Sequence, residues 1–341
     1  MKQTPTFITS FKQFRDAAYA FRLPRIIFSA LEINLFTKME DRDWTIPKLA
    51  KHLGASQRGL AILCRNLASA GLLVKSQSGY HLTPFSKRYL QESSPDFRGD
   101  YLGLMQRQWS EWSHLTEVIR VGQPRDSKEP ETTEYRRSFS WAMHHRSLQP
   151  AKEVAQQISL KAARSLLDLG GGPGTYALAF LALNPILHAT VMDRPAALDV
   201  ARMLAEQSSL GTRLTYQAGD FLTARIAGTY DVVWYSNVLH IYSPAENLKI
   251  FKKIKRILNP GGRLLIQDTF LQDPKELQPP EANLFAVSML LYTERGNTYS
   301  VRDVREWLQR AGLIRSRVLH LKEGTGDWEG QLIEGRLPRT G

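Results

Sequence analysis

LLDLGGGPGTYALAF, residues 166–180, runs from an apolar strand-like segment through a cluster of glycines into a helix-like segment. Gly170, Gly171, Gly172 and Gly174 leave almost no side chains where the chain would bend. Glycine is favoured where a backbone turns tightly or comes close to a ligand. A strand, a glycine turn and a helix in this order predict the first unit of an α/β sheet, with a ligand at the turn.

Apolar strand-like runs alternate with amphipathic helix-like segments after this stretch. The strand-like runs lie at 188–193, 213–220, 231–237 and 262–268. Strict alternation predicts a parallel sheet flanked by helices. Two more strand-like runs, 315–321 and 330–337, follow each other without a helix between them, which predicts a hairpin that closes one edge of the sheet.

Three aspartates stand where the first three strands of this pattern end. Asp168 lies just before the glycines, Asp193 ends the second strand, and Asp220 precedes Phe221 after the third. A carboxylate at Asp168 can hold an ammonium group, and Asp193 can accept both hydroxyls of a ribose. Asp220 and Phe221 offer a hydrogen-bond acceptor beside an aromatic face, which suits an adenine. S-adenosylmethionine combines these three chemical groups.

A dinucleotide is the alternative ligand for the glycine turn. Gly172, Gly174 and Ala177 satisfy the permissive Gly-x-Gly-x-x-Gly/Ala pattern. A pyrophosphate at this turn would be repelled by Asp168. A nicotinamide-dependent oxidoreductase is therefore disfavoured by the acidic residues at the strand ends.

The first 100 residues have the pattern of a winged helix-turn-helix. Residues 11–40 are predicted as two helices, and 45–90 as a short helix, a turn, a second helix and two short strands. The formal net charge of +12 is compatible with a polyanionic partner. The second helix, however, carries only Arg58 and Arg65 as basic side chains, fewer than a DNA-reading helix exposes. Nucleic acid is therefore not expected as a partner.

Composition places the chain among ordinary folded proteins, with 43% hydrophobic and 23% charged residues. No window reaches the ~18 consecutive apolar residues that span a bilayer, and the N-terminus lacks the apolar core of a secretion signal. We therefore expect a cytoplasmic protein without a membrane contact. The single cysteine, Cys64, excludes an intrachain disulfide and a cysteine-rich metal site. His144 and His145 are adjacent and would diverge by about 100° in a helix, so no metal site is expected.

The ordered motifs resemble those of class I S-adenosylmethionine-dependent methyltransferases. They are LLDLGGGPGTYALAF at 166–180, VMDRPAAL at 191–198, AGDFL at 218–222, NVLH at 237–240 and LNPGGRLLIQD at 258–268. Together with the winged-helix region, the chain from about residue 15 to its end is similar to the plant-type small-molecule O-methyltransferase family. That family includes acetylserotonin O-methyltransferases and bacterial enzymes of secondary metabolism.

The resemblance implies a fold, a domain organisation and partners. The fold is α/β, with a Rossmann-like class I methyltransferase domain over 151–341 whose mainly parallel sheet ends in a reversed strand. An all-α winged-helix dimerisation domain over 1–100 and a helical connector over 101–150 precede it. The implied partners are a second copy of the chain, bound through the N-terminal domain, and a small-molecule acceptor. S-adenosylmethionine would be the methyl donor, and S-adenosylhomocysteine the product.

The resemblance also carries family roles onto individual residues of this sequence. His240 stands at the position of the general base, and Asp268 at that of a glutamate that orients it, one carbon shorter. The implied donor-binding residues are Asp168, Gly170, Gly172, Gly174, Asp193, Arg194, Gly219, Asp220, Phe221 and Asn237. Met143 ends FSWAM, which matches a family segment close to the donor. The insert 271–299 would supply Phe285, Met289 and Tyr292 to the wall of the acceptor pocket.

Two departures from the family pattern keep alternatives open. Ile241 and Tyr242 replace the Asp and Trp that follow the family's histidine, and a second orienting glutamate corresponds to about Thr298. His240 would therefore have one carboxylate partner at most. Methylation of carbon or nitrogen on the same fold is one alternative to O-methylation. A winged-helix regulator that keeps the cofactor fold as a ligand sensor is another, and the sequence does not identify the acceptor.

Overall fold

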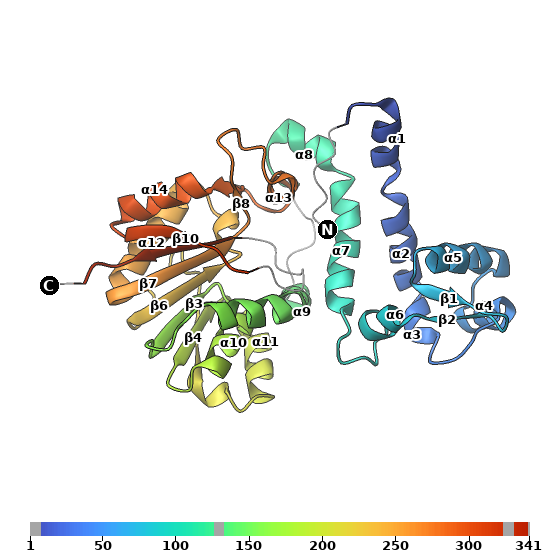
Figure 1. The fold of residues 1–341 in the computed structure, drawn as a ribbon, viewed down its shortest axis with the longest axis horizontal. Helices are drawn as coiled ribbons and strands as arrows, with labels where there is room; N and C mark the ends of the chain where they lie inside the picture. The colour runs from blue at the N-terminus through green and yellow to red at the C-terminus, as the bar shows by residue number, and fades with distance from the viewer. Residues whose placement is uncertain (1–7, 126–132, 323–330, 340–341) are drawn as a thin grey trace. The chain divides into compact units, whose positions relative to one another are not determined.

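The computed structural model describes residues 8–125, 133–322 and 331–339 (Figure 1). The chain forms two compact units, Met1–Gln106 and Arg107–Gly341, and the boundary falls within helix α7 (Gly99–Trp112). The domain limits expected at residues 100 and 150 stay predictions. The loop predicted at 122–131 lies outside the described residues from 126 onward. In the ranges that the structure describes, no helix is long and apolar enough to cross a membrane.

The first unit contains the predicted winged helix-turn-helix. Its elements are α1 (Phe11–Tyr19), α2 (Arg22–Glu32), α3 (Leu35–Lys38), α4 (Ile46–Leu53), α5 (Gln57–Ser69), β1 (Leu73–Lys75), β2 (Tyr80–Leu82) and α6 (Pro84–Tyr89). The prediction of two helices over 11–40 was wrong, because the region holds three. Asn34 takes a left-handed conformation with φ of 54°, which asparagine tolerates and which ends the helical run.

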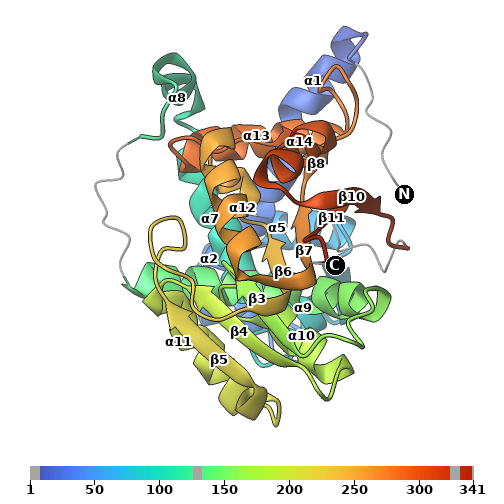
Figure 2. The ribbon, with the colours of Figure 1, turned by 90° about the vertical axis from the view of Figure 1, so that its left-hand side faces the viewer.

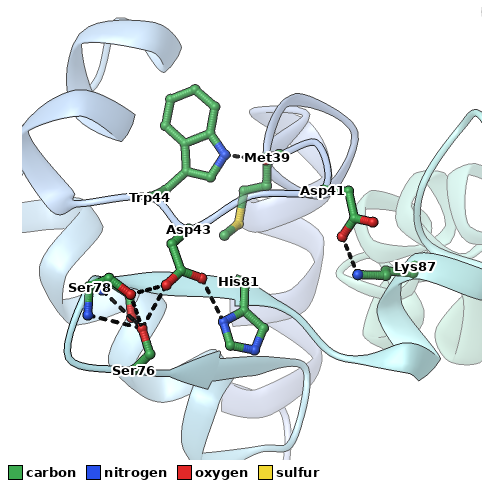
Figure 3. A network of polar contacts seen from close by, with 9 residues as sticks. Met39, Asp41, Asp43, Trp44, Ser76, Ser78, His81 and Lys87 are labelled. Atoms are coloured by element: carbon green, nitrogen blue, oxygen red, sulfur yellow. Dashed lines mark hydrogen bonds and ion pairs between the residues drawn. The ribbon is translucent and has the colours of Figure 1, made fainter.

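Hydrogen bonds fasten the hairpin of β1 and β2 to the loop between α3 and α4 (Figure 3). Asp43 accepts from the Ser76 hydroxyl at 3.0 Å and from the Ser78 hydroxyl, and its Oδ1 lies 2.9 Å from His81 Nδ1. The two serine hydroxyls lower the pKa of Asp43. Trp44 forms an antiparallel bridge with Tyr80 of β2 through two backbone hydrogen bonds. The side chains of Ser76, Ser78 and His81 are therefore bound to Asp43 within the same unit.

The second unit is built on a seven-stranded sheet in the order β10-β11-β7-β6-β3-β4-β5. The strands are β3 (Ser165–Leu169), β4 (His188–Asp193), β5 (Leu214–Ala218), β6 (Tyr230–Ser236), β7 (Leu258–Asp268), β10 (Ile314–Leu319) and β11 (Gln331–Arg336). β3 to β7 are parallel, whereas β11 runs antiparallel to β7 and β10 antiparallel to β11. The predicted parallel sheet and its closing hairpin are thus confirmed.

Helices cover both faces of this sheet, with α12 and α14 on one face and α9, α10 and α11 on the other (Figures 1 and 2). The helices are α8 (Leu115–Val121), α9 (Thr133–Gln157), α10 (Thr175–Leu183), α11 (Pro195–Glu206), α12 (Pro244–Ile257), α13 (Pro280–Tyr292) and α14 (Val301–Ala311), with 3₁₀ turns η1 (Gly211–Arg213) and η2 (Leu239–Ile241). Each face buries its own hydrophobic cluster, which fits the continuous apolar runs of the central strands.

A parallel pair of two-residue strands was not predicted from the sequence. β8 (Phe270–Leu271) pairs with β9 (Tyr299–Ser300), and together they bracket α13. Runs of two residues are too short to show the alternation that identifies a strand. The pair returns the segment after α13 to a position beside the end of β7.

The parallel strands bring their carboxyl ends to one edge of the sheet. The strand order reverses between β3 and β6, since β4 and β5 continue on one side and β7 on the other. Ligands of open α/β sheets bind at such a reversal, outside the carboxyl ends of the strands. Asp168, Asp193 and Asp268 occupy the last two positions of their strands, so the fold places them at this edge.

Candidate functional site

The turn after β3 is rich in glycine because neighbouring residues pack closely against its backbone and leave little room for side chains. Gly170 has φ of 72°, and a Cβ there would lie 2.7 Å from Val238 Cγ2, so both conformation and space require glycine. Gly172 has φ of 52°, and its N–H donates to Asp193 Oδ2 at 2.8 Å. Gly174, with φ of 70°, is the N-cap of α10. The turn therefore presents backbone rather than side chains at the strand ends.

Asp168 is a buried carboxylate with little to compensate its charge. It is 2% exposed, and its one hydrogen bond from the described part of the chain comes from Ala177 N–H at 3.3 Å. Desolvation raises the pKa of Asp168 to about 7, against the hydrogen bond from Ala177. A cation placed beside this carboxylate would stabilise its ionised form. The observation fits the expectation that Asp168 holds an ammonium group.

Asp193 links the glycine turn to the start of α11. Its Oδ1 accepts from Arg194 N–H at 2.7 Å, and its Oδ2 accepts from Gly172. Desolvation raises the pKa of Asp193, while these backbone donors lower it. Each carboxylate oxygen can accept a second hydrogen bond, so both oxygens can still receive the hydroxyls of a ribose.

The loop after β5 brings an exposed carboxylate and a buried ring to the same edge. Gly219 has φ of 152°, and its N–H donates to Asp193 O at 3.0 Å. Asp220 is exposed, and its Oδ1 accepts from Leu222 N–H at 2.8 Å. Phe221 is 6% exposed, and its ring would lie 3.3 Å from a Cβ on Gly170. The turns after β3 and β5 therefore meet at Phe221.

Asn237 begins the segment that follows β6. Its φ of 55° is left-handed, its N–H donates to Gln267 O at 2.8 Å, and its side-chain amide donates to Ser236 Oγ at 2.9 Å. The predicted donor-binding residues thus surround one strand-end region. A buried acceptor, further carboxylates, an aromatic ring and bare backbone fit a ligand with an ammonium group, a ribose and an adenine.

His240 and Asp268 form a hydrogen-bonded pair at the ends of β6 and β7. His240 Nδ1 lies 2.9 Å from Asp268 Oδ1 and 3.0 Å from Oδ2, and both residues are buried. The ring of Phe285 meets the His240 ring edge-on, with centroids 4.6 Å apart. Because Nδ1 faces the carboxylate, Nε2 is the nitrogen that can take a proton from a substrate.

Among the residues that the structure describes, no second carboxylate hydrogen bonds to His240 as the family pattern would have it. Thr298 is 4% exposed and follows Asn297, whose N–H donates to His240 O at 2.9 Å. Asp268 is thus the one carboxylate hydrogen-bonded to His240 within the described ranges. The His240 turn is held instead by backbone and amide contacts.

The other predicted pocket residues lie on α9 and α13. Met143 is partly buried on α9, where the neighbouring His144 Nδ1 lies 2.9 Å from Thr175 Oγ1 and ties α9 to the start of α10. Met289 is 7% exposed, which suits the alternative of core packing. Tyr292 is partly buried at the end of α13, and desolvation and the nearby Glu111 carboxylate raise the pKa of its hydroxyl. Phe285 is therefore the pocket candidate that the structure brings directly against His240.

A buried polar chain beside the site was missed by sequence reasoning. Gln267 donates from Nε2 to Tyr176 OH at 3.0 Å, and Ser236 Oγ donates to Gln267 Oε1 at 3.2 Å. The signal was present, since Ser236 and Gln267 are polar residues at the ends of apolar strands. This series of hydrogen bonds connects α10, β6 and β7, and it lies between Asp168 and His240 at the edge of the sheet.

Comparisons with protein families match both parts of the chain. A model described as the O-methyltransferase domain matches residues 112–314, and one described as the O-methyltransferase dimerisation domain matches residues 16–92. Neither description is that of a DNA-binding regulator, so the alternative of a ligand-sensing regulator is not favoured.

Individual proteins resemble the chain over nearly its whole length. A 3-hydroxy-5-methyl-1-naphthoate 3-O-methyltransferase from Streptomyces sahachiroi is 27% identical over 92% of this chain and 91% of its own. An L-tyrosine C(3)-methyltransferase from Streptomyces lavendulae is 26% identical over 83% and 81%.

Solved structures show the same fold. An O-methyltransferase family protein from Burkholderia thailandensis has a TM-score of 0.86 at 27% identity, covering 97% of this chain and 99% of its own. The human N-acetylserotonin methyltransferase, solved in complex with S-adenosylmethionine, has a TM-score of 0.84 at 22% identity, covering 98% and 99%.

Proposed function

Since this chain belongs to the O-methyltransferase family, we propose that it methylates a hydroxyl group of a small aromatic metabolite with His240 as general base. S-adenosylmethionine is the methyl donor of this enzyme class, and S-adenosylhomocysteine is the product. The observation that carries the proposal is the buried His240–Asp268 pair, which lies at the same strand-end edge as the residues suited to the donor.

The donor-binding roles follow from the chemistry of each strand end. Asp168 would hold the ammonium group, Asp193 the ribose hydroxyls, and Asp220 with Phe221 the adenine. The remaining contacts are assigned to the backbone and side chains of Gly170, Gly172, Gly174, Arg194, Gly219 and Asn237. The bound donor supplies a methyl group on a positively charged sulfur, so the protein's task is alignment and proton removal.

His240 and Asp268 would share the proton transfer. His240 Nε2 accepts the hydroxyl proton as the acceptor oxygen attacks, and this makes the ring positively charged. Asp268 holds the ring in the tautomer that leaves Nε2 unprotonated, and it then stabilises the imidazolium. Phe285 packs edge-on against the His240 ring and restricts its movement from that side.

An aromatic hydroxylated acceptor is supported by the relatives and by the lining of α13. The Streptomyces sahachiroi relative is named for O-methylation of a hydroxynaphthoate. Phe285 lies beside the proposed base, and we assign Met143, Met289 and Tyr292 to the rest of the wall. Methylation at carbon is a second candidate, because the Streptomyces lavendulae relative is named as a C-methyltransferase and Thr298 leaves His240 with a single carboxylate.

A labelled-donor screen tests the proposed reaction. We expect the purified enzyme to transfer the labelled methyl group to members of a panel of phenols, naphthols and hydroxyindoles, and NMR of the product distinguishes O-methyl from C-methyl. A panel that includes matched O-methylated compounds separates the two, since blocking the hydroxyl should abolish the reaction. Transfer to the blocked compounds at the parent rate would contradict O-methylation.

The substitution Asp193→Ala tests the donor site separately. We expect the dissociation constant for S-adenosylmethionine to rise about 10- to 100-fold, because the carboxylate removed accepts charge-assisted hydrogen bonds. Calorimetric titration measures this constant. The control is Asp199→Ala, which removes an exposed carboxylate of α11 that pairs with Arg202 and should bind the donor as the parent does. Equal affinity in the parent and Asp193→Ala would overturn the assignment.

We also propose that two copies associate through the first unit, which the dimerisation-domain model matches. Large apolar side chains are exposed on α1 and at the start of α2. They are Phe11, Phe14, Tyr19, Phe21 and Leu23, each at least 47% exposed. Apolar patches of this kind mark protein interfaces. A cytoplasmic location and the absence of nucleic-acid binding stay predictions of the sequence.

Sedimentation of a charged variant tests this interface. We expect the parent to sediment as a dimer and the pair Phe11→Lys and Phe14→Lys to sediment as a monomer, because two charges would be buried without partners. Ile186→Lys places the same charge at a residue of the second unit that is 49% exposed, and should remain dimeric. A dimeric double variant would contradict the proposal.

A further inference from the structure

Helix α12 connects directly to the turn that carries His240. The turn η2 ends at Ile241, and α12 begins at Pro244 with Ser243 as its N-cap. Ser243 and Glu246 form a reciprocal capping box, in which Ser243 N–H donates to Glu246 Oε2 at 2.9 Å. The start of the helix is therefore fixed two residues after the proposed base turn.

Asn247 on this helix donates hydrogen bonds to the backbone on both sides of His240. Its side chain is fully buried, and Nδ2 donates to Leu239 O at 2.9 Å and to Tyr242 O at 3.0 Å. The hydroxyl of Tyr235 donates to Asn247 Oδ1 at 3.3 Å and holds the amide in place. Because Leu239 and Tyr242 flank His240, the Asn247 amide determines the path of the turn.

Lys253 on the same helix donates hydrogen bonds to the loop that carries Asp220 and Phe221. Its ammonium group donates to Phe221 O at 3.0 Å, Leu222 O at 2.7 Å and Ala224 O at 3.0 Å. An ammonium has three N–H donors, so these carbonyls use all of them. Desolvation lowers the pKa of Lys253, as expected for a cation partly withdrawn from water. The Lys253 side chain therefore stabilises the backbone turn at Phe221–Ala224, although Lys253 itself lies on a separate helix.

The His240 turn and the loop of Asp220 and Phe221 also contact each other. The rings of Phe221 and Tyr242 meet edge-on with centroids 5.6 Å apart. The His240 turn and the loop of Asp220 and Phe221 therefore pack against each other at these two rings. Asn247 and Lys253 are six residues apart, which is about 9 Å along a helix axis, so one rigid element sets the spacing between them.

We propose that α12 is a positioning helix, in which Asn247 aligns the His240 turn and Lys253 orders the donor loop of Asp220 and Phe221. The inference rests on the proposed function, because it assigns the base to His240 and the adenine contact to the donor loop. Neither residue touches the reacting atoms. Their effects should consequently separate, with Lys253 acting on donor binding and Asn247 on the chemical step.

The Lys253 half is tested by Lys253→Met, which keeps the apolar stem and removes the three donors. We expect the KM and the dissociation constant for S-adenosylmethionine to rise about tenfold, because the loop would adopt its donor-binding conformation for a smaller fraction of the time. The kcat at saturating donor should stay within about twofold. Amide hydrogen exchange at Leu222 and Ala224, whose N–H groups bond to Asp220, should speed up in the donor-free protein.

Two matched variants complete this test. Lys252→Met removes the exposed neighbouring ammonium and should match the parent in all measurements. Lys253→Arg keeps donors for the loop carbonyls and should recover part of the donor affinity. Unchanged affinity in Lys253→Met, or an equal loss in Lys252→Met, would overturn the role of Lys253. Should Lys253→Met not fold, Lys253→Gln is compared by the same measurements.

The Asn247 half is tested by Asn247→Ala in two backgrounds. In the parent we expect kcat to fall about tenfold with donor affinity within about twofold, because a misplaced base costs rate rather than binding. In the His240→Ala background the same substitution should cost nothing further, since no base remains to be aligned. Asn66→Ala, at an exposed helical position, is the control, and Asn247→Ser replaces Asn247→Ala if folding fails.

The double-variant comparison separates failure of this inference from failure of the proposed function. If His240→Ala retains the parent's kcat, the assignment of the base is wrong. If His240→Ala is impaired and Asn247→Ala matches the parent, the base assignment stands and the positioning role is wrong. An equal loss from Asn247→Ala in both backgrounds would also overturn it, because that residue would then act on general stability rather than through His240.

Discussion

Replacing His240 with alanine is expected to lower kcat by roughly 10²- to 10⁴-fold, the range that a positioned general base contributes. His240 Nδ1 is held by Asp268, so Nε2 is the nitrogen of this ring that can accept the proton of the substrate hydroxyl. Donor affinity should remain within about threefold, because the predicted donor contacts are made by residues other than His240. Initial rates with a labelled donor, combined with calorimetric titration, measure both quantities.

Controls separate loss of the base from loss of packing. His240→Ala also leaves the buried Asp268 carboxylate without its side-chain partner, so His240→Asn, which can still donate to that carboxylate, should fold as the parent and stay inactive. His188→Ala removes an exposed histidine at the start of β4 and should keep full activity. Full activity in both His240 variants would show that the acceptor loses its proton without this residue.

Much of this arrangement could be predicted because the strand ends follow from periodicity. Alternating strands and helices require a parallel sheet, and a parallel sheet brings Asp168, Asp193 and Asp220 to one edge whatever the details of packing. The pairing of His240 with Asp268 needed the family resemblance, because they are separated by a helix and most of a strand. The structure explains it through the adjacency of β6 and β7, in which Ser236 pairs with Gln267.

The residues that sequence reasoning missed are those whose partners are backbone atoms. Lys253 lies in the run KKIKR at 252–256, where its neighbours are also basic and helical periodicity predicts solvated side chains. Its three carbonyl partners belong to a loop about 30 residues earlier. Every residue has a backbone carbonyl, so the sequence does not show which of them bind a side chain. Asn247 is similar, since a buried asparagine on a helix shows neither a charge pattern nor a motif.

Replacing Asp168 with asparagine is expected to weaken donor binding and, at the same time, to stabilise the donor-free protein at about pH 8. The pKa of Asp168 is raised to about 7, from an ordinary value of 3.8, by desolvation. The folded chain therefore holds this proton more tightly than the unfolded chain does. The free energy of unfolding falls as the pH rises from about 4 to about 7, by up to about 4 kcal/mol in total.

Asparagine removes this dependence because it carries no charge at any of these pH values. Its side-chain oxygen can still accept from Ala177 N–H, so the local hydrogen bond is kept. Urea unfolding at about pH 8 should show a gain of a few kcal/mol for Asp168→Asn over the parent, and the gain should nearly vanish near pH 4, where the parent carboxyl is neutral in the folded state and only partly ionised in the unfolded state. Asp199→Asn, at an exposed position, should show neither effect.

Donor binding should respond in the opposite direction. An ammonium group pairs with the ionised carboxylate, so affinity in the parent should rise up to tenfold per pH unit below about 7 and level off above it. In Asp168→Asn the affinity should be roughly 10- to 100-fold lower at about pH 8 and nearly flat with pH. A variant that binds the donor as the parent does would remove Asp168 from the donor site. One that binds poorly but is no more stable at about pH 8 would mean that the buried carboxylate is compensated by contacts within the protein. Only the combination of weaker binding and greater stability identifies a charge that is kept buried for its ligand.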